Sequence, residues 1–153
     1  MFNRRKDSKP LKLLAEDRDD LLVISAALQD GVFKVGDLSH DPKARRLSLV
    51  LNRFRREAAA DKAPGQRVQS VLAIDSVLSI QSRKIRLGPG DLVAQILALQ
   101  FHGADGDGSD PSGALHLVLA GGAEIRIQVE CVDVTLSDIS PAWTARARPD
   151  HGE

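Results

Sequence analysis

Two short basic clusters carry the strongest binding chemistry in the sequence. One is Arg53-Phe54-Arg55-Arg56 and the other is Arg83-Lys84-Ile85-Arg86. Arginine can hold a planar carboxylate or phosphate through two parallel hydrogen bonds, and a neighbouring apolar residue adds an anchoring contact. If the two strand ends meet, they form a single cationic edge. We therefore expect a non-catalytic interaction domain whose site consists of Arg53, Phe54, Arg55, Arg56, Arg83, Lys84 and Arg86.

Other interpretations of these clusters stay open. Basic residues at strand ends also prevent edge-to-edge association of sheets. A nucleic-acid binder is possible but disfavoured, because 21 Lys and Arg balance 21 Asp and Glu and the net charge is zero. With no Tyr, one Trp and four Phe, the chain offers few surfaces on which bases could stack. The expected partner is a protein, and the pattern indicates neither its identity nor the oligomeric state.

The only thiol, Cys131, supports an alternative function as an enzyme nucleophile. A reactive cysteine needs a histidine, a cation or a helix N-terminus that stabilises the thiolate. Cys131 follows the apolar series Ile125, Ile127 and Val129, and unpaired cysteines are among the most buried residues. We expect Cys131 to be an inert core residue. No nucleotide-binding, hydrolase or metalloprotease motif occurs in the sequence.

Neither the histidines nor the acidic loop predicts a metal site or a cofactor. His102 and His116 lie on neighbouring expected strands, but zinc sites use three or four ligands. The loop GADGDGSDPSG resembles a calcium loop, but counting from Asp105 puts Asp110 and His116 where an EF-hand needs Gly and Glu. Gly and Asp are common turn residues, so we expect a solvated connector.

Composition places the chain among cytoplasmic proteins. A single cysteine excludes an internal disulfide and suits a reducing compartment. The basic start MFNRRKDSKP is not followed by an apolar run of signal length, and no stretch approaches the roughly 20 apolar residues of a membrane span. We expect a cytoplasmic protein with no membrane partner.

An amphipathic helix near the N-terminus and a hairpin near the C-terminus are the clearest structural signals. Asp17–Gln29 has an acidic start and apolar residues at helical spacing, with Gly31 as the expected stop. In LHLVLAGGAEIRIQVEC, apolar residues alternate on either side of the glycines. A two-residue loop would put charges on the leucine face, so we predict a three-residue loop, Ala120–Gly122, that pairs Leu117 with Ile125.

The remaining elements are mostly strands. We predict strands over residues 11–15, 32–38, 46–56, 68–82 and 97–102, with a bulge or a twist near Asn52 where Phe54 breaks the alternation of leucines. Residues 68–82 fit either one bent strand or two strands joined at Asp75-Ser76. For residues 132–139, apolar spacing favours a short helix before Pro141, whereas the β-branched residues favour a strand. We favour the helix.

These elements predict a single α+β domain over residues 11–143, between flexible tails at 1–10 and 144–153. The domain is mostly antiparallel β, with about seven strands, an N-terminal amphipathic helix and a short C-terminal helix. This plan resembles a pleckstrin-homology-like barrel or a curved sheet, and fold analogy of this kind does not determine function.

Four segments of the chain resemble one bacterial family. They are LKLLAEDRDDLLVISAALQDGV, ARRLSLVLNRFRRE, SVLSIQSRKI and AGGAEIRIQVECVDVTLSDISPAW. Together they are similar to the mainly alphaproteobacterial family known as domain of unknown function 2948, over roughly residues 11–150. The resemblance implies a cytoplasmic protein and assigns no activity and no functional residues.

Overall fold

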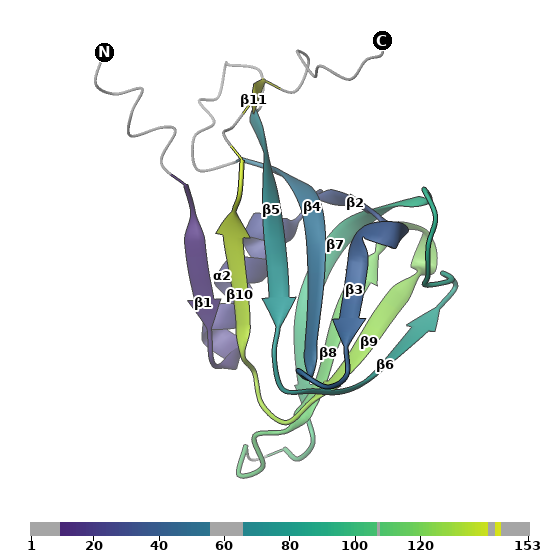
Figure 1. Ribbon diagram of the computed structural model, residues 1–153. Helices are drawn as coiled ribbons and strands as arrows, with labels where there is room; N and C mark the ends of the chain where they lie inside the picture. Colours follow the sequence, from purple (N-terminus) through teal and green to yellow (C-terminus); the bar gives the residue numbers. More distant parts are fainter. Residues whose placement is uncertain (1–9, 56–65, 107, 141–142, 145–153) are drawn as a thin grey trace, which may run out of the picture.

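The chain forms one antiparallel sheet and a helix. The computed structural model describes residues 10–55, 66–106, 108–140 and 143–144. Within them lie eleven strands in the order β1-β10-β5-β4-β2-β7-β8-β9-β6, with β3 also paired to β4 and β11 to β5 (Figure 1). The elements are β1 (Lys12–Ala15), α2 (Arg18–Leu28), β2 (Val32–Lys34), the 3-10 turn η1 (Val35–Asp37), β3 (Leu38–Asp41), β4 (Arg46–Phe54), β5 (Gln66–Ile74), β6 (Val77–Arg83), β7 (Val93–Gly103), β8 (Gly113–Leu119), the 3-10 turn η3 (Ala120–Gly122), β9 (Glu124–Val129), β10 (Val134–Asp138) and β11 (Trp143–Thr144).

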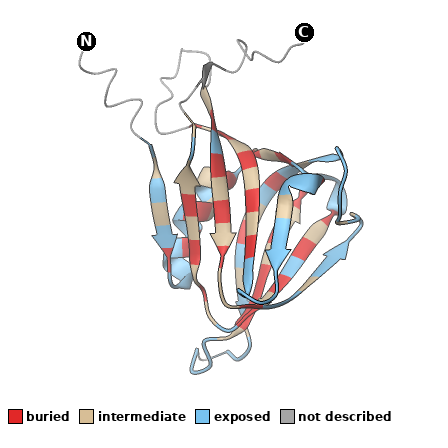
Figure 2. Ribbon diagram, in the orientation of Figure 1, coloured by how far each residue is buried: buried red, intermediate tan, exposed pale blue. Residues whose placement is uncertain are grey.

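The sheet folds over into two layers. The front layer contains β1, β10, β5, β4 and β3, and the back layer contains α2, β7, β8, β9 and β6 (Figure 1). The short strand β2 joins them, because it pairs with both β4 and β7. Alternating residues of the central strands β4, β5, β8 and β9 point between the layers, which Figure 2 shows as alternating bands of burial. The enclosed core is almost entirely aliphatic, as the shortage of aromatic residues requires.

Helix α2 confirms the prediction for residues 17–29. Asp17 is the N-cap, and its Oδ1 accepts a hydrogen bond of 2.8 Å from the Asp20 N–H. Leu21, Ile24 and Leu28 are buried in the core. The helix ends differently from the prediction, because Asp30, with φ of 69°, takes the left-handed conformation expected at Gly31.

The hairpin of β8 and β9 has the predicted register. Leu117 pairs with Ile125 across the two strands, and the loop between the strands is Ala120–Gly122. Gly121 and Gly122 have φ of 83° and 81°, which a side chain would strongly disfavour.

The predicted C-terminal helix is wrong, since residues 134–138 form strand β10. This strand lies between β1 and β5 and pairs with both. Val134 and Leu136 point into the core while Thr135 and Ser137 point outward. Of the residues whose spacing suggested a helix, Val132 and Leu136 fit this alternation, whereas Ile139 is exposed. Pairing on both edges of the strand satisfies its backbone N–H and C=O groups. The described part of the chain therefore has one α-helix, at its N-terminal end, whereas the prediction placed a helix at each end of the domain.

Three strand predictions needed refinement. The strand predicted over residues 32–38 is divided by η1 into β2 and β3. Residues 68–82 form two strands, β5 and β6, and Asp75-Ser76 is the corner between them. The bulge near Asn52 is wrong, because β4 and β5 pair without a register shift from Leu47 to Phe54.

Candidate functional site

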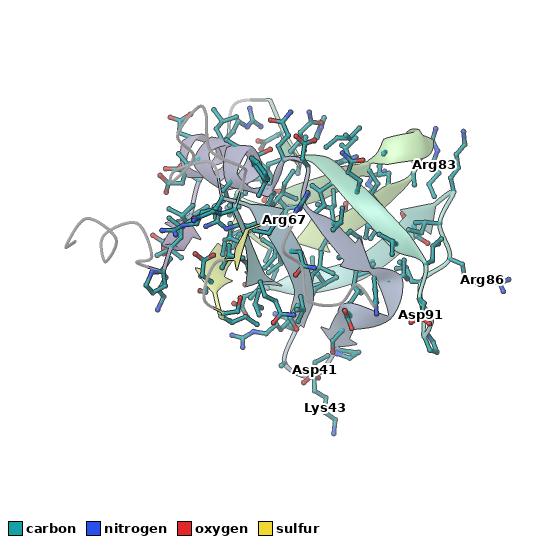
Figure 3. The ribbon with its side chains drawn as sticks, turned by 90° about the horizontal axis from the view of Figure 1, so that it is seen from above. Asp41, Lys43, Arg67, Arg83, Arg86 and Asp91 are labelled. Carbon is teal, nitrogen blue, oxygen red and sulfur yellow. The ribbon has the colours of Figure 1, made fainter. Side chains whose placement is uncertain are left out.

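The two basic clusters lie in different parts of the molecule. The first is at the end of β4 and the second is at the end of β6, and the sheet order places β2, β7, β8 and β9 between these strands. In Figure 3, Arg67, the register partner of Phe54, is well separated from Arg83 and Arg86. The expectation that folding joins the two clusters into one edge is therefore wrong.

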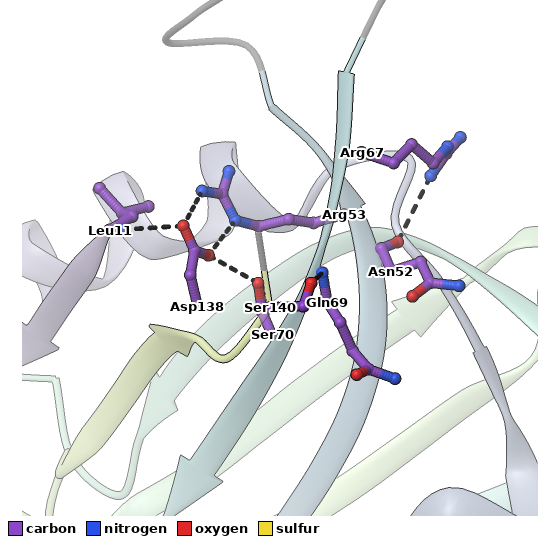
Figure 4. Close-up of polar contacts among 8 residues, drawn as sticks. All are labelled: Leu11, Asn52, Arg53, Arg67, Gln69, Ser70, Asp138 and Ser140. Carbon is purple, nitrogen blue, oxygen red and sulfur yellow. Dashed lines mark hydrogen bonds and ion pairs between the residues drawn. The ribbon is translucent and has the colours of Figure 1, made fainter. Parts of the chain in front are cut away.

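Arg53 is a core residue. Its side chain is fully buried, because it occupies the inward parity of β4 after Leu47, Leu49 and Leu51. Its guanidinium binds the carboxylate of Asp138 on β10 through two hydrogen bonds, Nε to Oδ1 at 3.0 Å and Nη2 to Oδ2 at 3.1 Å (Figure 4). Arg53 thus connects the front-layer strands β4 and β10 from inside.

Two further donors complete the surroundings of Asp138. Ser70 Oγ on β5 donates to Oδ1 at 2.8 Å, and the Leu11 N–H donates to Oδ2 at 2.8 Å (Figure 4). Burial raises the pKa of the Asp138 carboxyl, but the hydrogen bonds from Arg53, Leu11 and Ser70 outweigh it, so this pKa lies below its ordinary value. The network links β4, β5 and β10 to Leu11, the residue before β1, at one end of the front layer.

The neighbours of Arg53 are also engaged in packing. Arg55 is 4% exposed, and its backbone N–H donates to the Gln66 carbonyl at 2.7 Å. The Arg67 guanidinium carbon lies 5.6 Å from the centroid of the Phe54 ring, within range of a cation–π contact. Arg56 lies outside the described residues.

The second cluster is on the surface. Arg83, Lys84 and Arg86 are all exposed, and Figure 3 shows Arg83 and Arg86 projecting from the end of β6 and the segment that follows it. Among the described residues, none of these three cations has a carboxylate within 4.0 Å. Lys84 has φ of 59°, a left-handed conformation that redirects the chain immediately after β6.

The back face, meaning the outward side of β7, β8, β9 and β6, adds polar groups that the sequence reasoning did not assign to a site. Arg126 is exposed on β9 and lies in register with His116 on β8 and Gln81 on β6. His116 Nδ1 is 2.8 Å from Glu124 Oε2, and the ring centroids of His102 and His116 are 4.4 Å apart. The predicted hairpin register already implied that His116 and Arg126 face each other.

A hollow of about 450 Å³ lies on this face next to β6. It is lined by Gln81, Ser82, Arg83, Glu124 and Arg126. Glu124 is the one carboxylate of the lining and is already in contact with His116. The hollow thus offers two guanidinium groups, an amide and a hydroxyl, which are donors for a carboxylate or another oxyanion.

Cys131 is half-buried rather than fully buried. It follows β9, and its Sγ lies 3.9 Å from Ser76 Oγ. A serine hydroxyl does not stabilise a thiolate as a histidine or a cation does. This contact gives no support to a nucleophilic role.

In the acidic loop between β7 and β8, the carboxylates accept hydrogen bonds from the loop's own residues. Asp105 accepts hydrogen bonds from the Gly108 N–H, the Ser109 hydroxyl and the Asp110 N–H. The backbone and side chain of Ser112 donate to Asp110, and these bonds hold the pKa of that carboxyl below its ordinary value. Among the described residues, no group of three or more His, Cys, Asp or Glu is arranged to hold a metal ion.

The described chain is thus a two-layer antiparallel β domain with an exposed basic site beside one strand edge. Residues 11–151 match the family described as "Protein of unknown function (DUF2948)", and the chain belongs to that family. No curated protein and no solved structure matches the chain. Within the described residues, no helix has the length and apolar character needed to cross a membrane.

Proposed function

We propose that this protein is a non-catalytic interaction domain that binds an extended, acidic segment of a partner protein along β6. The observation that carries the proposal is a strand edge that no described strand pairs with and that ends beside exposed cations with no ion-pair partner among the described residues. The site, called here the β6 edge site, consists of β6 together with Lys84, Arg86 and Arg126.

The edge of β6 is suited to accept another strand. Among the described strands, β6 pairs only with β9. At its other edge the Val77 N–H donates to the Arg45 carbonyl at 2.9 Å, and from Ser79 to Arg83 no described strand pairs with that edge. Its first six residues are uncharged and contain no proline, although charge and proline are common protections of natural edges. A register shift lies between Val77 and Ser79, and from Ser79 to Arg83 the pairing with β9 is regular. An added strand would therefore pair with Ser79–Arg83.

The cations beside β6 indicate that the bound segment of the partner is acidic. Arg83, Lys84, Arg86 and Arg126 are exposed around the C-terminal half of β6, with Glu124 as the nearby carboxylate. Acidic side chains on the guest strand would enter the hollow between Arg83 and Arg126. Arginine binds carboxylates through paired hydrogen bonds, which adds specificity to the backbone pairing.

The direction of the guest follows from the sheet. Every pair of strands in the described sheet is antiparallel. An antiparallel guest would place its N-terminal end beside Arg83, so its acidic residues belong at that end. The interaction would take place in the cytoplasm, as the lone thiol Cys131 suggests.

A polypeptide fits this site better than a nucleic acid. Unpaired backbone N–H and C=O groups recognise another backbone of the same kind. The described part of the site has no aromatic residue on which bases could stack.

The proposal is tested with two labelled peptides of alternating valine and threonine, one with glutamates at its N-terminus and one with the glutamates at its C-terminus. We expect the first peptide to bind more tightly in fluorescence anisotropy, and a lysine version not to bind. Arg83→Glu with Arg126→Glu should lower affinity at least about tenfold, because losing two charge-assisted contacts removes more than about 1.4 kcal/mol.

The matched control is Lys12→Glu with Lys43→Glu, which makes the same charge change at two exposed lysines on other elements. It should bind the glutamate peptide like the wild type. Equal binding of the glutamate and lysine peptides would contradict the proposal. So would a single-stranded RNA that binds more tightly than the peptide and is lost in the Arg83→Glu, Arg126→Glu variant.

A further inference from the structure

We propose that the outward side of the front layer is the interface of a reversible homodimer. This front face is formed by β1, β10, β5, β4 and β3 and is the side that Figure 1 presents to the viewer. It is separate from the β6 edge site, which lies on the back layer.

The middle of the front face is uncharged on β10, β5 and β4, and Lys12 on β1 lies at the end of the row that contains Ser137 and Val71. Its outward residues on β10, β5 and β4 are small or amide-bearing, and most are half-buried, as the tan bands in Figure 2 show. They are Thr135, Ser137, Gln69, Val71, Ala73, Ser48, Val50 and Asn52. A sheet that faces water usually carries charged and strongly polar residues on that side, as the back face does with Arg83, Glu124 and Arg126. Small, uncharged side chains instead suit packing against a second sheet.

The two borders of the front face carry opposite charge. At the lower border, Asp75 follows the end of β5 and forms an ion pair of 2.8 Å with Arg46 on β4. Arg46 lies in register with Asp41 on β3, while Asp133 directly precedes β10 and Glu16 directly follows β1. Four of these five side chains are carboxylates. The upper border of β5 carries Arg67.

This arrangement is self-complementary under two-fold symmetry. Arg67 lies on β5 four residues before Val71, and Asp75 lies four residues after Val71, directly beyond the end of the strand. Val71 pairs with Val50 at the centre of the face. A two-fold axis through this row and perpendicular to the strands would place Asp75 of each copy opposite Arg67 of the other. It would also place Val71 against its own copy. An isologous interface requires this kind of self-matching surface.

The size of the face indicates a weak dimer. Five strands about 4.8 Å apart and a length of about 27 Å along β5 give roughly 600 Å² per copy. A standard stable interface buries about 800 Å² per partner. Dimerisation should therefore depend on protein concentration.

The test is analytical ultracentrifugation of the full chain over a wide concentration range. The wild type should shift from monomer to dimer as concentration rises. Val71→Lys should remain monomeric, because it places two lysines against each other at the axis. The control Val118→Lys makes the same substitution at a half-buried outward position of β8 on the back face, and should dimerise like the wild type.

A pair of charge variants keeps the test decisive if Val71→Lys fails to fold. Asp75→Arg and Arg67→Asp should each dimerise weakly alone, because like charges would then face each other. An equal mixture of the two should dimerise at least as well as the wild type, because each Arg–Asp contact is restored across the interface. A wild type that stays monomeric throughout, or a mixture no better than its components, would overturn the dimer proposal.

Discussion

The two arginine clusters look alike in the sequence and have opposite environments in the fold. Arg53 is fully buried and bound to Asp138, whereas Arg83 is exposed and has no carboxylate within 4.0 Å among the described residues. The difference arises from strand parity. Arg53 continues the inward series of leucines on β4, while Arg83 lies on the outward parity of β6 opposite Glu124. Two clusters of similar composition therefore differ in role: Arg53 stabilises the core, whereas Arg83 remains available for binding.

The largest effect is expected when Arg53 is removed. Arg53→Ala should lower the free energy of unfolding by about 3–5 kcal/mol, because it leaves the buried Asp138 carboxylate without its counter-ion and opens a cavity. Urea unfolding followed by circular dichroism measures the change. A loss below about 1 kcal/mol would show that Arg53 does not stabilise the core.

A smaller loss of folding stability is expected at acidic pH. The pKa of Asp138 is lower in the folded chain than its ordinary value of 3.8, so its stabilising contribution is present above pH 3.8. That contribution is lost as pH falls below 3.8 through the folded pKa, because the unfolded chain binds the proton first. Asp138→Asn should therefore lose less stability than the wild type over this acid range. Parallel stability curves for the two proteins below pH 3.8 would contradict this account.

The smallest effect on stability is expected at the second cluster. Arg83→Glu should change the free energy of unfolding by no more than about 0.5 kcal/mol, because the side chain is exposed and has no ion-pair partner in the described chain. Thermal unfolding of Arg83→Glu, measured alongside that of Arg53→Ala, compares the two clusters directly. If Arg83→Glu is as destabilising as Arg53→Ala, the two clusters do not differ as the fold indicates.

The sequence predicted local structure best where one face had to be apolar. The register of the β8–β9 hairpin followed from keeping Leu117 and Ile125 on the same side, and α2 followed from its acidic start and apolar stripe. Arg53 was misplaced because Phe54 was taken to break the alternation of β4. The unbroken parity after Leu51 already pointed inward, and an inward arginine required a partner that is 85 residues away in sequence.

The parts that sequence reasoning missed depend on long-range pairing. Strand β10 forms because β1 and β5 offer edges on both sides, a condition that local spacing around Val134 and Leu136 does not contain. The proposed site at β6 likewise depends on Arg126, which lies in register with Gln81 and lines the same hollow as Arg83 only because β9 pairs with β6. The same order of strands separates the two basic clusters.

The most direct test of the proposed function is amide hydrogen exchange of the full chain with and without the N-terminally acidic peptide. Added-strand binding predicts slower exchange of the backbone N–H groups of β6 that face away from β9, with little change in β1 or β3. These strands are internal controls, because each also has an edge that no other described strand pairs with. Peptide binding without added protection within Ser79–Arg83, or with protection centred on β1 or β3, would contradict the assignment of the site to β6.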